Sequence, residues 1–336
     1  MTSGEQLADR ALATLTGLAI GDALGMPTQS LPRSVIKDRY GLLTGFLPGP
    51  ADQPIAPNMP AGSVTDDTEQ AVLLGRLLVA GDGKIDPHQL AEKLLAWEQD
   101  MRGRGSLDLL GPSTKAAVAA VAAGRPIEEA GRHGTTNGAA MRIAPVGIAC
   151  PATDIAVLVE QVVAASWVTH NTGVALAGAA AVAGAVSAGL AGADLATATD
   201  IAVRAAELAG GRGHWVAAGD VAARIMLAQQ LVAGRDPADA AERIYRLVGT
   251  SVATQESVPA AFAVLAMYPD DPWQACLVAA SLGGDCDTIA AIVGAIAGAC
   301  HGSAGFPVSA ATTIAEVNRL PLARLAADLL ALRQRG

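Results

Sequence analysis

Half of this 336-residue chain is hydrophobic (51%), yet it contains only 4 Trp, 3 Tyr and 3 Phe residues. A core of this composition has to be filled by Ala, Val, Leu and Ile side chains instead of aromatic rings. Small side chains allow helix backbones to approach one another closely, so we expect tightly packed helices. The apolar fraction is also far above that of disordered chains, and the composition therefore predicts a folded protein.

The apolar residues between the loops recur three and four positions apart, which is typical of α-helices. We expect helices over residues 7–24, 68–79, 87–101, 113–123, 155–166, 199–208, 216–232, 237–247, 257–266, 273–282, 288–300 and 322–333. No convincing run alternates β-branched with polar residues, and no linker separates two halves. Residues 47–63 contain five prolines and predict an ordered loop. The sequence therefore predicts an all-α fold with about a dozen helices in a single domain, residues 1–336.

Residues 173–193 contain no charged side chain and are long enough to imitate a membrane span. They comprise ten Ala and five Gly but only two Leu and three Val, so their hydrophobicity is weak. We expect a buried helix here and no membrane partner. The polar first ten residues do not resemble a secretory signal, and the 4 Cys residues form no C-x-x-C motif. These features predict a cytoplasmic protein.

The formal net charge of −9 gives the chain no general attraction for phosphate backbones. Ten aromatic rings also provide few platforms on which nucleic-acid bases can stack. We therefore expect no nucleic-acid partner. A local basic patch is still compatible with a small phosphate-bearing ligand.

Oxygen-bearing side chains gather at two predicted helix starts. Residues 62–69 read Gly-Ser-Val-Thr-Asp-Asp-Thr-Glu, and residues 283–288 read Gly-Gly-Asp-Cys-Asp-Thr. One interpretation is helix capping, because Asp and Thr are good N-caps and acids suit the positive end of the helix dipole. Capping needs only one such residue, however, and adjacent carboxylates repel each other. A cation between them is the alternative that the sequence leaves open.

Together the two clusters contain four carboxylates and two threonine hydroxyls. A set made only of oxygen donors selects a hard cation such as Mg²⁺, Mn²⁺ or Ca²⁺ over zinc. The five His residues have no zinc-type spacing. Four carboxylates exceed what one Mg²⁺ usually takes from a protein, so two metal ions are plausible.

Four motifs in this order resemble the ADP-ribosylglycohydrolase family. They are Gly-Asp-Ala-Leu-Gly at 21–25, Thr-Asp-Asp-Thr at 65–68, Thr-Asn-Gly-Ala-Ala-Met-Arg at 136–142 and Gly-Gly-Asp-Cys-Asp-Thr at 283–288. The family includes ADP-ribosylarginine and ADP-ribosylserine hydrolases, the glycohydrolase that reactivates dinitrogenase reductase, and the lens protein crystallin J1. The resemblance extends over about residues 11–302, which we take as the core of the domain.

The resemblance implies a compact all-α bundle with a dinuclear Mg²⁺ or Mn²⁺ site in a cleft. Matched motif by motif, the implied metal ligands are Thr65, Asp66, Asp67, Asp285, Asp287 and Thr288. The implied reaction is hydrolysis of the N-glycosidic C1′ bond of an ADP-ribosyl group by a metal-activated water. Asp66, Asp67 and Asp285 are then catalytic as well as ligating.

One residue departs from the family pattern. The family commonly has a catalytic or ribose-contacting Glu seven residues after the Asp of its first motif, and Gln29 stands at that position here. A Gln orients a water or a ribose hydroxyl but cannot take up a proton. Either the base lies elsewhere or catalysis rests on the metals. We rank a metal-activated water first and Asp100 as the base second, with Glu98 and a metal-bridging Asp as further candidates. A solvated helix end is the plainer interpretation of both acids.

The remaining candidates are substrate contacts. Gly105 and Ser106 lie in a Gly- and Arg-rich turn, and Ser113 stands at a helix start suited to an anion. In the third motif the resemblance implies that Asn137, Gly138 and Met141 line the cleft, and Gln29 is a further candidate substrate contact. His170 is either a ligand contact or a structural histidine.

Three functions follow from these features. The first is removal of ADP-ribose from a protein or a small molecule. The second, favoured by Gln29 and by the shortage of aromatic rings for stacking adenine, is hydrolysis of a small nucleoside or ribosyl metabolite. The third is a catalytically silent binder, as crystallin J1 shows the family permits. Four carboxylates without a cation would repel strongly, which disfavours the third.

Overall fold

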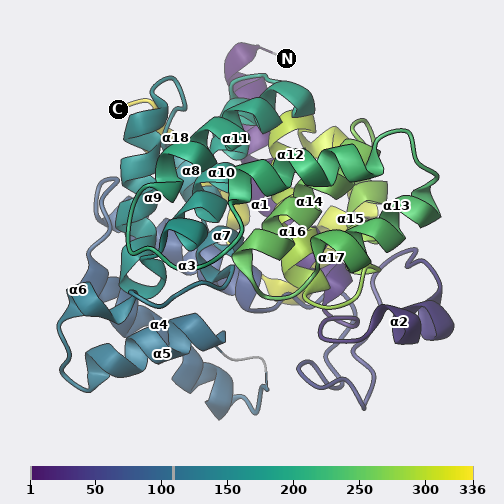
Figure 1. The fold of residues 1–336 in the computed structure, drawn as a ribbon, viewed down its shortest axis with the longest axis horizontal. Helices are drawn as coiled ribbons and strands as arrows, with labels where there is room; N and C mark the ends of the chain where they lie inside the picture. The colour runs from purple at the N-terminus through teal and green to yellow at the C-terminus, as the bar shows by residue number, and fades with distance from the viewer. Residues whose placement is uncertain (1, 108–109, 336) are drawn as a thin grey trace.

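The computed structural model describes residues 2–107 and 110–335. These residues form α-helices joined by loops, with one short π-helix, one 3₁₀ turn and no β-strand; three isolated bridges are their only β-pairings. Figure 1 shows the helices packed closely against one another. The all-α prediction is confirmed.

The helices are α1 (Ser3–Gly25), α2 (Arg33–Tyr40), α3 (Asp66–Ala80), α4 (Pro87–Gly103), α5 (Pro112–Ala122), α6 (Ile127–Ala130), α7 (Gly138–Met141), α8 (Ala144–Ala149), α9 (Ile155–His170), α10 (Gly173–Leu190), α11 (Leu195–Gly210), α12 (Val221–Val232), α13 (Pro237–Arg243), α14 (Thr254–Met267), α15 (Pro272–Ala280), α16 (Cys286–His301), α17 (Val308–Asn318) and α18 (Leu322–Arg333), with the π-helix at Ile244–Val248.

Helices α1 and α16 lie antiparallel and in close contact at the centre of the molecule. Glycines make this approach possible. A Cβ on Gly17 would lie 2.2 Å from the carbonyl oxygen of Gly294, and a Cβ on Gly21 would lie 1.9 Å from that of Ala290. At the end of the seam, Gly25 packs in the same way against the backbone of Asp287. The close helix packing expected from the small residues is confirmed, and it places the start of α16 beside the end of α1.

Helix α10 is the core helix that the uncharged stretch predicted. All of its residues except Gly173 are buried, and it packs against α8, α9, α11 and α16. By length and composition it is the one described helix able to cross a membrane, but 94% of its apolar window is buried inside the molecule. The interpretation as a buried helix is therefore confirmed.

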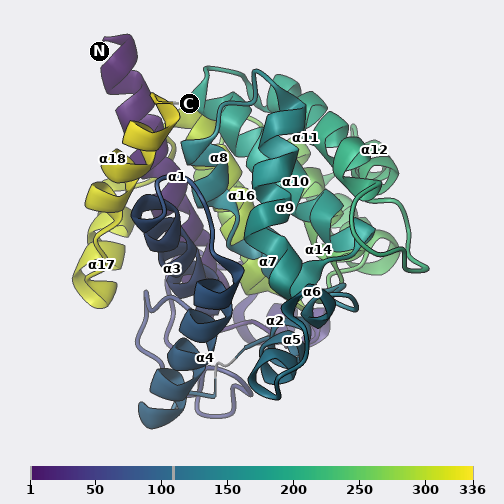
Figure 2. The same ribbon diagram turned by 90° about the vertical axis from the view of Figure 1, so that its left-hand side faces the viewer.

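Smaller elements surround this core. Helices α3 and α4 lie to one side of α1, and α17 and α18 cover its outer face (Figure 2). Residues 47–63 form the expected ordered loop, in which the Gly49 N–H donates to the Met59 carbonyl and the Asn58 N–H donates to the Gly49 carbonyl. Buried apolar residues from α1 to α18 form one continuous core.

The predicted helices are all present, with differences at their ends. The expected start at residue 216 is wrong, because α12 begins at Val221 after its N-cap Asp220. The expected helix over 237–247 changes to a π-helix at Ile244. Helices α2, α6, α7, α8 and α17 were not predicted.

Candidate functional site

The two acidic clusters meet where α3 and α16 begin. Thr65 is the N-cap of α3 and Asp285 is the N-cap of α16, so each cluster occupies the first turn of its helix. The Thr288 hydroxyl donates a hydrogen bond to Oδ2 of Asp67 at 3.2 Å and so joins the two helix starts. The six residues implied as metal ligands therefore lie in one neighbourhood, although their two segments are more than 200 residues apart in the sequence.

Two carboxylate oxygens in this neighbourhood have no donor. Oδ1 of Asp67 and Oδ1 of Asp287 are buried without a hydrogen-bond partner among the described residues, and the two side chains are 1% and 2% exposed. Burial, reinforced by the neighbouring carboxylates, raises the pKa of both side chains well above the ordinary value. A buried, unpartnered carboxylate costs several kcal/mol by order of magnitude, and a cation removes that cost.

These residues fit a hard divalent cation. The donors are all carboxylate or hydroxyl oxygens, which is the set that Mg²⁺ and Mn²⁺ prefer. In the part of the chain that the structure describes, no three His, Cys, Asp or Glu side chains form a ready-made ligand group by themselves. A bound ion would therefore draw on the hydroxyls of Thr65 and Thr288 as well as on the carboxylates.

Asp22 is the residue that the sequence reasoning did not assign to the site. Its buried carboxylate accepts hydrogen bonds from the backbone N–H and the hydroxyl of both Thr65 and Thr68, at 2.5 to 3.1 Å. Burial raises its pKa to about 6, while these hydrogen bonds oppose the rise. Asp22 thus holds the first turn of α3 against α1. Its place in the Gly-Asp-Ala-Leu-Gly motif was the available signal.

Asn137 positions the second cluster. It caps the short helix α7, and its Nδ2 donates to Oδ2 of Asp285 at 2.5 Å and to the Ser257 hydroxyl at 2.9 Å. The pKa of Asp285 is raised by burial and lowered by hydrogen bonds from Asn137 and Thr288. The side chain predicted to contact the substrate is therefore engaged with a predicted metal ligand.

A buried arginine stands behind the first cluster. Gln70 Nε2 donates to Oδ2 of Asp66 at 2.9 Å, and Arg142 Nη1 donates to Oε1 of the same Gln70 at 2.8 Å. Arg142 is only 1% exposed, and burial lowers its pKa to about 10. Gln70 lies between Arg142 and Asp66, so the positive charge of Arg142 partly offsets the negative charge of the carboxylates without a direct ion pair.

The same network continues to His170. Arg142 Nη2 donates to the Thr169 hydroxyl at 2.6 Å, and that oxygen lies 2.8 Å from Nδ1 of His170. The other ring nitrogen lies 3.2 Å from the Thr136 hydroxyl. Burial, followed by the charge of Arg142, lowers the pKa of His170 well below its usual value. His170 is therefore a neutral, buried member of a hydrogen-bond network.

Gln29 lies beside the loop that carries Asp285. The neighbouring residues Ser30 and Leu31 exchange backbone hydrogen bonds with Gly284 at 2.7 and 2.9 Å. The Gln29 side chain is 6% exposed, and its Nε2 has no hydrogen-bond partner among the described residues. It is a buried donor that a ligand can satisfy.

Asp100 lies apart from the acidic clusters. Its side chain is 67% exposed near the end of α4 and forms an ion pair with Arg104 at 3.0 Å. Glu98 pairs with Arg102 on the same helix. Asp100 is linked to the first cluster only through Arg104, which also pairs with Glu69. The side chain of Glu98 is 12% exposed and its Oε1 is buried without a hydrogen-bond partner among the described residues. The plainer interpretation as a solvated helix end therefore describes Asp100 but not Glu98.

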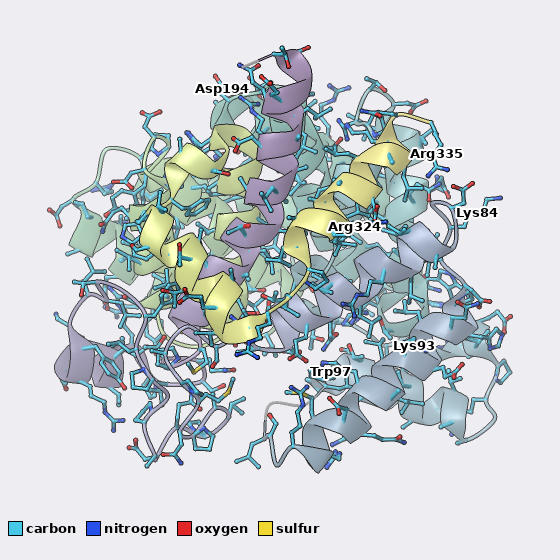
Figure 3. All side chains as sticks on the ribbon, turned by 180° about the vertical axis from the view of Figure 1, so that it is seen from behind. Lys84, Lys93, Trp97, Asp194, Arg324 and Arg335 are labelled. Carbon is cyan, nitrogen blue, oxygen red and sulfur yellow. The ribbon has the colours of Figure 1, made fainter. Side chains whose placement is uncertain are left out.

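Glu69, the last acid of the first cluster, also turns away from it. Its Oε2 accepts hydrogen bonds from Trp97 Nε1 at 2.5 Å and from Arg104 at 3.2 Å. Figure 3 shows Trp97 on α4. The carboxylate therefore ties α3 to α4.

The other predicted substrate contacts fall into two groups. Gly105 and Ser106 line a cavity of about 390 Å³ together with Ser63 and Glu69, which belong to the first acidic cluster. Ser113, Gly138 and Met141 form the second group, which lies at or beside α7. The Ser113 hydroxyl accepts from the backbone N–H groups of residues 135 and 136 at 3.3 Å, and a Cβ on Gly138 would lie 3.0 Å from the His170 ring. Met141 is 6% exposed within α7.

The structure is an all-helical fold in which α3 and α16 start together at the end of α1. Each of the two helix starts carries acidic and threonine side chains. The chain belongs to the ADP-ribosylglycohydrolase family, because the profile of that family, described as ADP-ribosylglycohydrolase, matches residues 3–336. The resemblance inferred from the four motifs is therefore confirmed.

Relatives and a solved structure agree with this assignment. The uncharacterized protein YegU of Escherichia coli strain K12 is 36% identical over 327 residues, which cover 97% of this chain and 98% of YegU. The ADP-ribosylarginine hydrolase Tri1 of Pseudomonas putida strain GB-1 is 31% identical over 314 residues, or 90% of this chain and 73% of Tri1. A solved structure described as an ADP-ribosylglycohydrolase-related protein complex covers 98% of this chain and 99% of its own, with a TM-score of 0.71 at 24% identity, and so has the same fold.

Proposed function

We propose that this protein is a Mg²⁺- or Mn²⁺-dependent hydrolase that cleaves the C1′ bond of an ADP-ribosyl group on a protein or a small molecule. The observation that carries the proposal is the pair of buried, unpartnered oxygens on Asp67 and Asp287, at two helix starts that meet. Membership of the ADP-ribosylglycohydrolase family supports the reaction class.

The proposed ligands are Thr65, Asp66, Asp67, Asp285, Asp287 and Thr288, sharing two cations. When bound, divalent cations supply Lewis acidity, which lowers the pKa of a water molecule and anchors vicinal hydroxyl oxygens. Asn137 fixes Asp285 through its hydrogen bond, and Asp22 fixes the first turn of α3. These two residues set the geometry in which the other carboxylates act.

The protein's own side chains have two further roles in this proposal. The carboxylate-rich surround stabilises the positive charge that develops on the ribose in an oxocarbenium-like transition state. Gln29 offers its unpartnered Nε2 as a donor to a ribose hydroxyl or a water oxygen. Because an amide cannot accept a proton there, Gln29 orients the reactants and does not act as a base.

A small nucleoside or ribosyl metabolite is the second candidate substrate. The observation that favours it is Gln29, whose neutral amide stands where the family commonly has Glu. The proposed cytoplasmic location is compatible with either substrate.

The decisive experiment measures turnover of ADP-ribosyl-arginine, ADP-ribosyl-serine, O-acetyl-ADP-ribose and simple nucleosides with Mg²⁺ or Mn²⁺. We expect activity on one substrate class that EDTA abolishes and added metal restores. Asp66→Ala and Asp285→Ala should lose both bound metal and activity. Asp100→Ala, an exposed acid outside the clusters, is the matched control and should retain both. Unchanged metal content in Asp285→Ala, or activity that persists in EDTA, contradicts the proposal.

Gln29→Glu distinguishes the two substrate classes. A general base contributes about 10²- to 10⁴-fold in rate. If ADP-ribosyl compounds are the substrates, a carboxylate at this position should raise their turnover by about 100-fold. If the substrate is a small ribosyl metabolite that needs the amide donor, its KM should rise instead. If Gln29→Glu changes neither the turnover of ADP-ribosyl compounds nor the KM for the small metabolite, Gln29 is not part of the proposed site.

A further inference from the structure

A second cavity, of about 580 Å³, lies between α2 and α13. Figure 1 shows these two helices next to each other at the edge of the molecule. None of the residues predicted for the carboxylate site lines it. Its volume is within the usual range for sites that hold small molecules, roughly 300 to 1,000 Å³. The residues that matter for its chemistry are Arg33, Lys37, Leu42, Ala241, Tyr245 and Tyr268.

The cavity wall is aromatic in a chain that has few rings. Two of the three tyrosines in the whole sequence, Tyr245 and Tyr268, line it, and both are partly buried. Among the described rings the one close pair is Phe46 with Trp273, so these tyrosines stack on no other ring. Together with Leu42 and Ala241 they present an apolar wall suited to a flat, hydrophobic group.

The cavity also holds a free positive charge. Arg33 is engaged, since its Nε lies 3.3 Å from Glu242 and its Nη1 donates to the carbonyls of Ser281 and Leu282. Lys37, by contrast, is exposed and forms no ion pair or hydrogen bond through its ammonium group in the described part of the chain. In a molecule of net charge −9, this is a local place for one anionic group.

Arg33, which lines the cavity, also supports the loop that carries Asp285. Arg33 begins α2 directly after the segment that exchanges hydrogen bonds with Gly284. Gly283 has a φ of +92°, and a Cβ there would lie 2.6 Å from the backbone nitrogen of Arg33. The Arg33 side chain and backbone therefore contact residues 281–283, immediately before the Asp285 carboxylate. A ligand that contacts Arg33 acts on this loop.

We propose that the cavity between α2 and α13 is an accessory binding site for a small aromatic anion, a flat ring that carries one phosphate or carboxylate. The ring packs against Tyr245, Tyr268 and the apolar wall, and the anionic group pairs with Lys37. Occupancy restricts the motion of Arg33 and so of the loop that carries Asp285. The proposal goes beyond the hydrolase function, because it concerns a different cavity and does not depend on turnover.

Calorimetry with three probes in EDTA tests the binding. AMP carries both a ring and an anionic group, adenosine lacks the anion and ribose 5-phosphate lacks the ring. EDTA leaves the carboxylate clusters without cations, so they repel a phosphate. We expect AMP to bind at least about tenfold more tightly than either comparator, which corresponds to about 1.4 kcal/mol. Absence of AMP binding, or equal binding of all three probes, overturns the proposal.

Variants locate the site. Lys37→Glu and Tyr268→Leu should each weaken AMP binding at least tenfold, whereas Lys84→Glu, a charge reversal on the far side of the molecule (Figures 1 and 3), should not. Asn137→Ala, at the carboxylate site, should leave AMP binding unchanged. If Asn137→Ala abolishes binding and Lys37→Glu does not, AMP occupies the other site and the proposal is wrong.

Hydrogen exchange tests the coupling. AMP should slow amide exchange across residues 281–285 in the parent protein but not in Lys37→Glu. Binding without any change in this segment overturns the inferred link between the cavity and the loop. Neither measurement involves hydrolysis, so its outcome is independent of the enzymatic proposal.

Discussion

The buried acids of the site fall into two chemical classes. Asp22 and Asp285 have carboxylate oxygens that accept hydrogen bonds from well-placed donors, whereas Asp67 and Asp287 each keep one oxygen without a donor. The hydrogen bonds of Asp22 and Asp285 fix the positions of these side chains, and the donor-free oxygens of Asp67 and Asp287 are available to a ligand. Asp67 and Asp287 each lie in the first turn of a helix and each keep an oxygen without a donor, which is the pattern expected of cation ligands.

The raised pKa values predict how stability depends on pH. Asp22 has a pKa of about 6 in the folded protein against 3.8 as an ordinary side chain, and burial together with the neighbouring carboxylates raises the pKa of Asp67 and of Asp287 well above the ordinary value. The metal-free folded state therefore binds more protons than the unfolded state, and the stability that these carboxyls retain at low pH is lost as pH rises through their folded pKa values. We expect this contribution to the Tm in EDTA to fall as pH rises above about 4 and through the folded pKa values, which for Asp22 is about 6.

Two controls isolate this effect. His170 has a lowered pKa and produces the opposite slope below its ordinary value of 6.5, so the parent is compared with a variant that keeps His170. Asp287→Asn should flatten the slope and raise the Tm in EDTA, because it removes one buried charge. Saturating Mn²⁺ should raise the parent Tm but not that of the variant. A parent Tm that rises with pH in EDTA relative to the Tm of Asp287→Asn contradicts the predicted direction.

At the residue scale the sequence revealed which residue types gather but not all of their partners. Carboxylates and hydroxyls at two helix starts predicted the clusters because their positions are local to the chain. The hydrogen bonds of Asp22 to Thr65 and Thr68 cross more than 40 residues, and no spacing rule discloses them. Asp100 lies on the exposed face of α4, paired with Arg104, which residue type alone does not reveal.

At the element scale, the glycine seam between α1 and α16 explains how the carboxylates come together. Gly21→Ala places a methyl group where the carbonyl oxygen of Ala290 lies 1.9 Å away, which forces the helices apart. We expect it to destabilise the protein by about 3 kcal/mol or more. The measurement is urea unfolding, together with the Tm increase produced by Mn²⁺, which should shrink because the start of α16 moves away from α3.

Gly4→Ala in the same helix is the matched control. A Cβ on Gly4 meets nothing within 4 Å, so this substitution gains helix propensity without a clash. It should stabilise the protein slightly, by less than about 1 kcal/mol. If both alanines have the same effect, the seam does not depend on close backbone contact.

Most of the helices that sequence periodicity missed, with α17 as the exception, are too short or too exposed to show a repeating apolar pattern. Helices α6, α7 and α8 have four, four and six residues, fewer than two turns each, and α2 has Ile36 as its only buried residue. The premature start expected for α12 arose because Val216 fits the apolar spacing. The N-cap hydrogen bond from Ala223 N–H to Asp220 instead fixes the start at Val221.

At the scale of the whole molecule, the site joins parts that are far apart in the chain. Asp66 and Asp67 belong to α3, while Asp285 and Asp287 belong to α16, and the Thr288–Asp67 hydrogen bond already links them. A cation held by both helix starts ties these elements together. Two divalent ions would also reduce the net charge from −9 to about −5.

Metal binding should therefore protect both helix starts at once. In hydrogen exchange, Mn²⁺ should slow the amides of residues 65–69 and of residues 283–288 to a similar extent. The amides of α4, which carries Asp100, serve as the internal control and should not change. Protection of only one helix start would mean that the ion is held by a single cluster.

The antiparallel contact between α1 and α16 has a consequence for biosynthesis. Gly25 ends the first helix, and its packing partner Asp287 leaves the ribosome about 260 residues later, a delay of roughly 13 to 50 s at ordinary elongation rates. During that interval the glycine face of α1 has no partner and only one acidic cluster has been made. The glycine face of α1 therefore meets its partner helix, and the second group of proposed cation ligands joins the first, only after that interval.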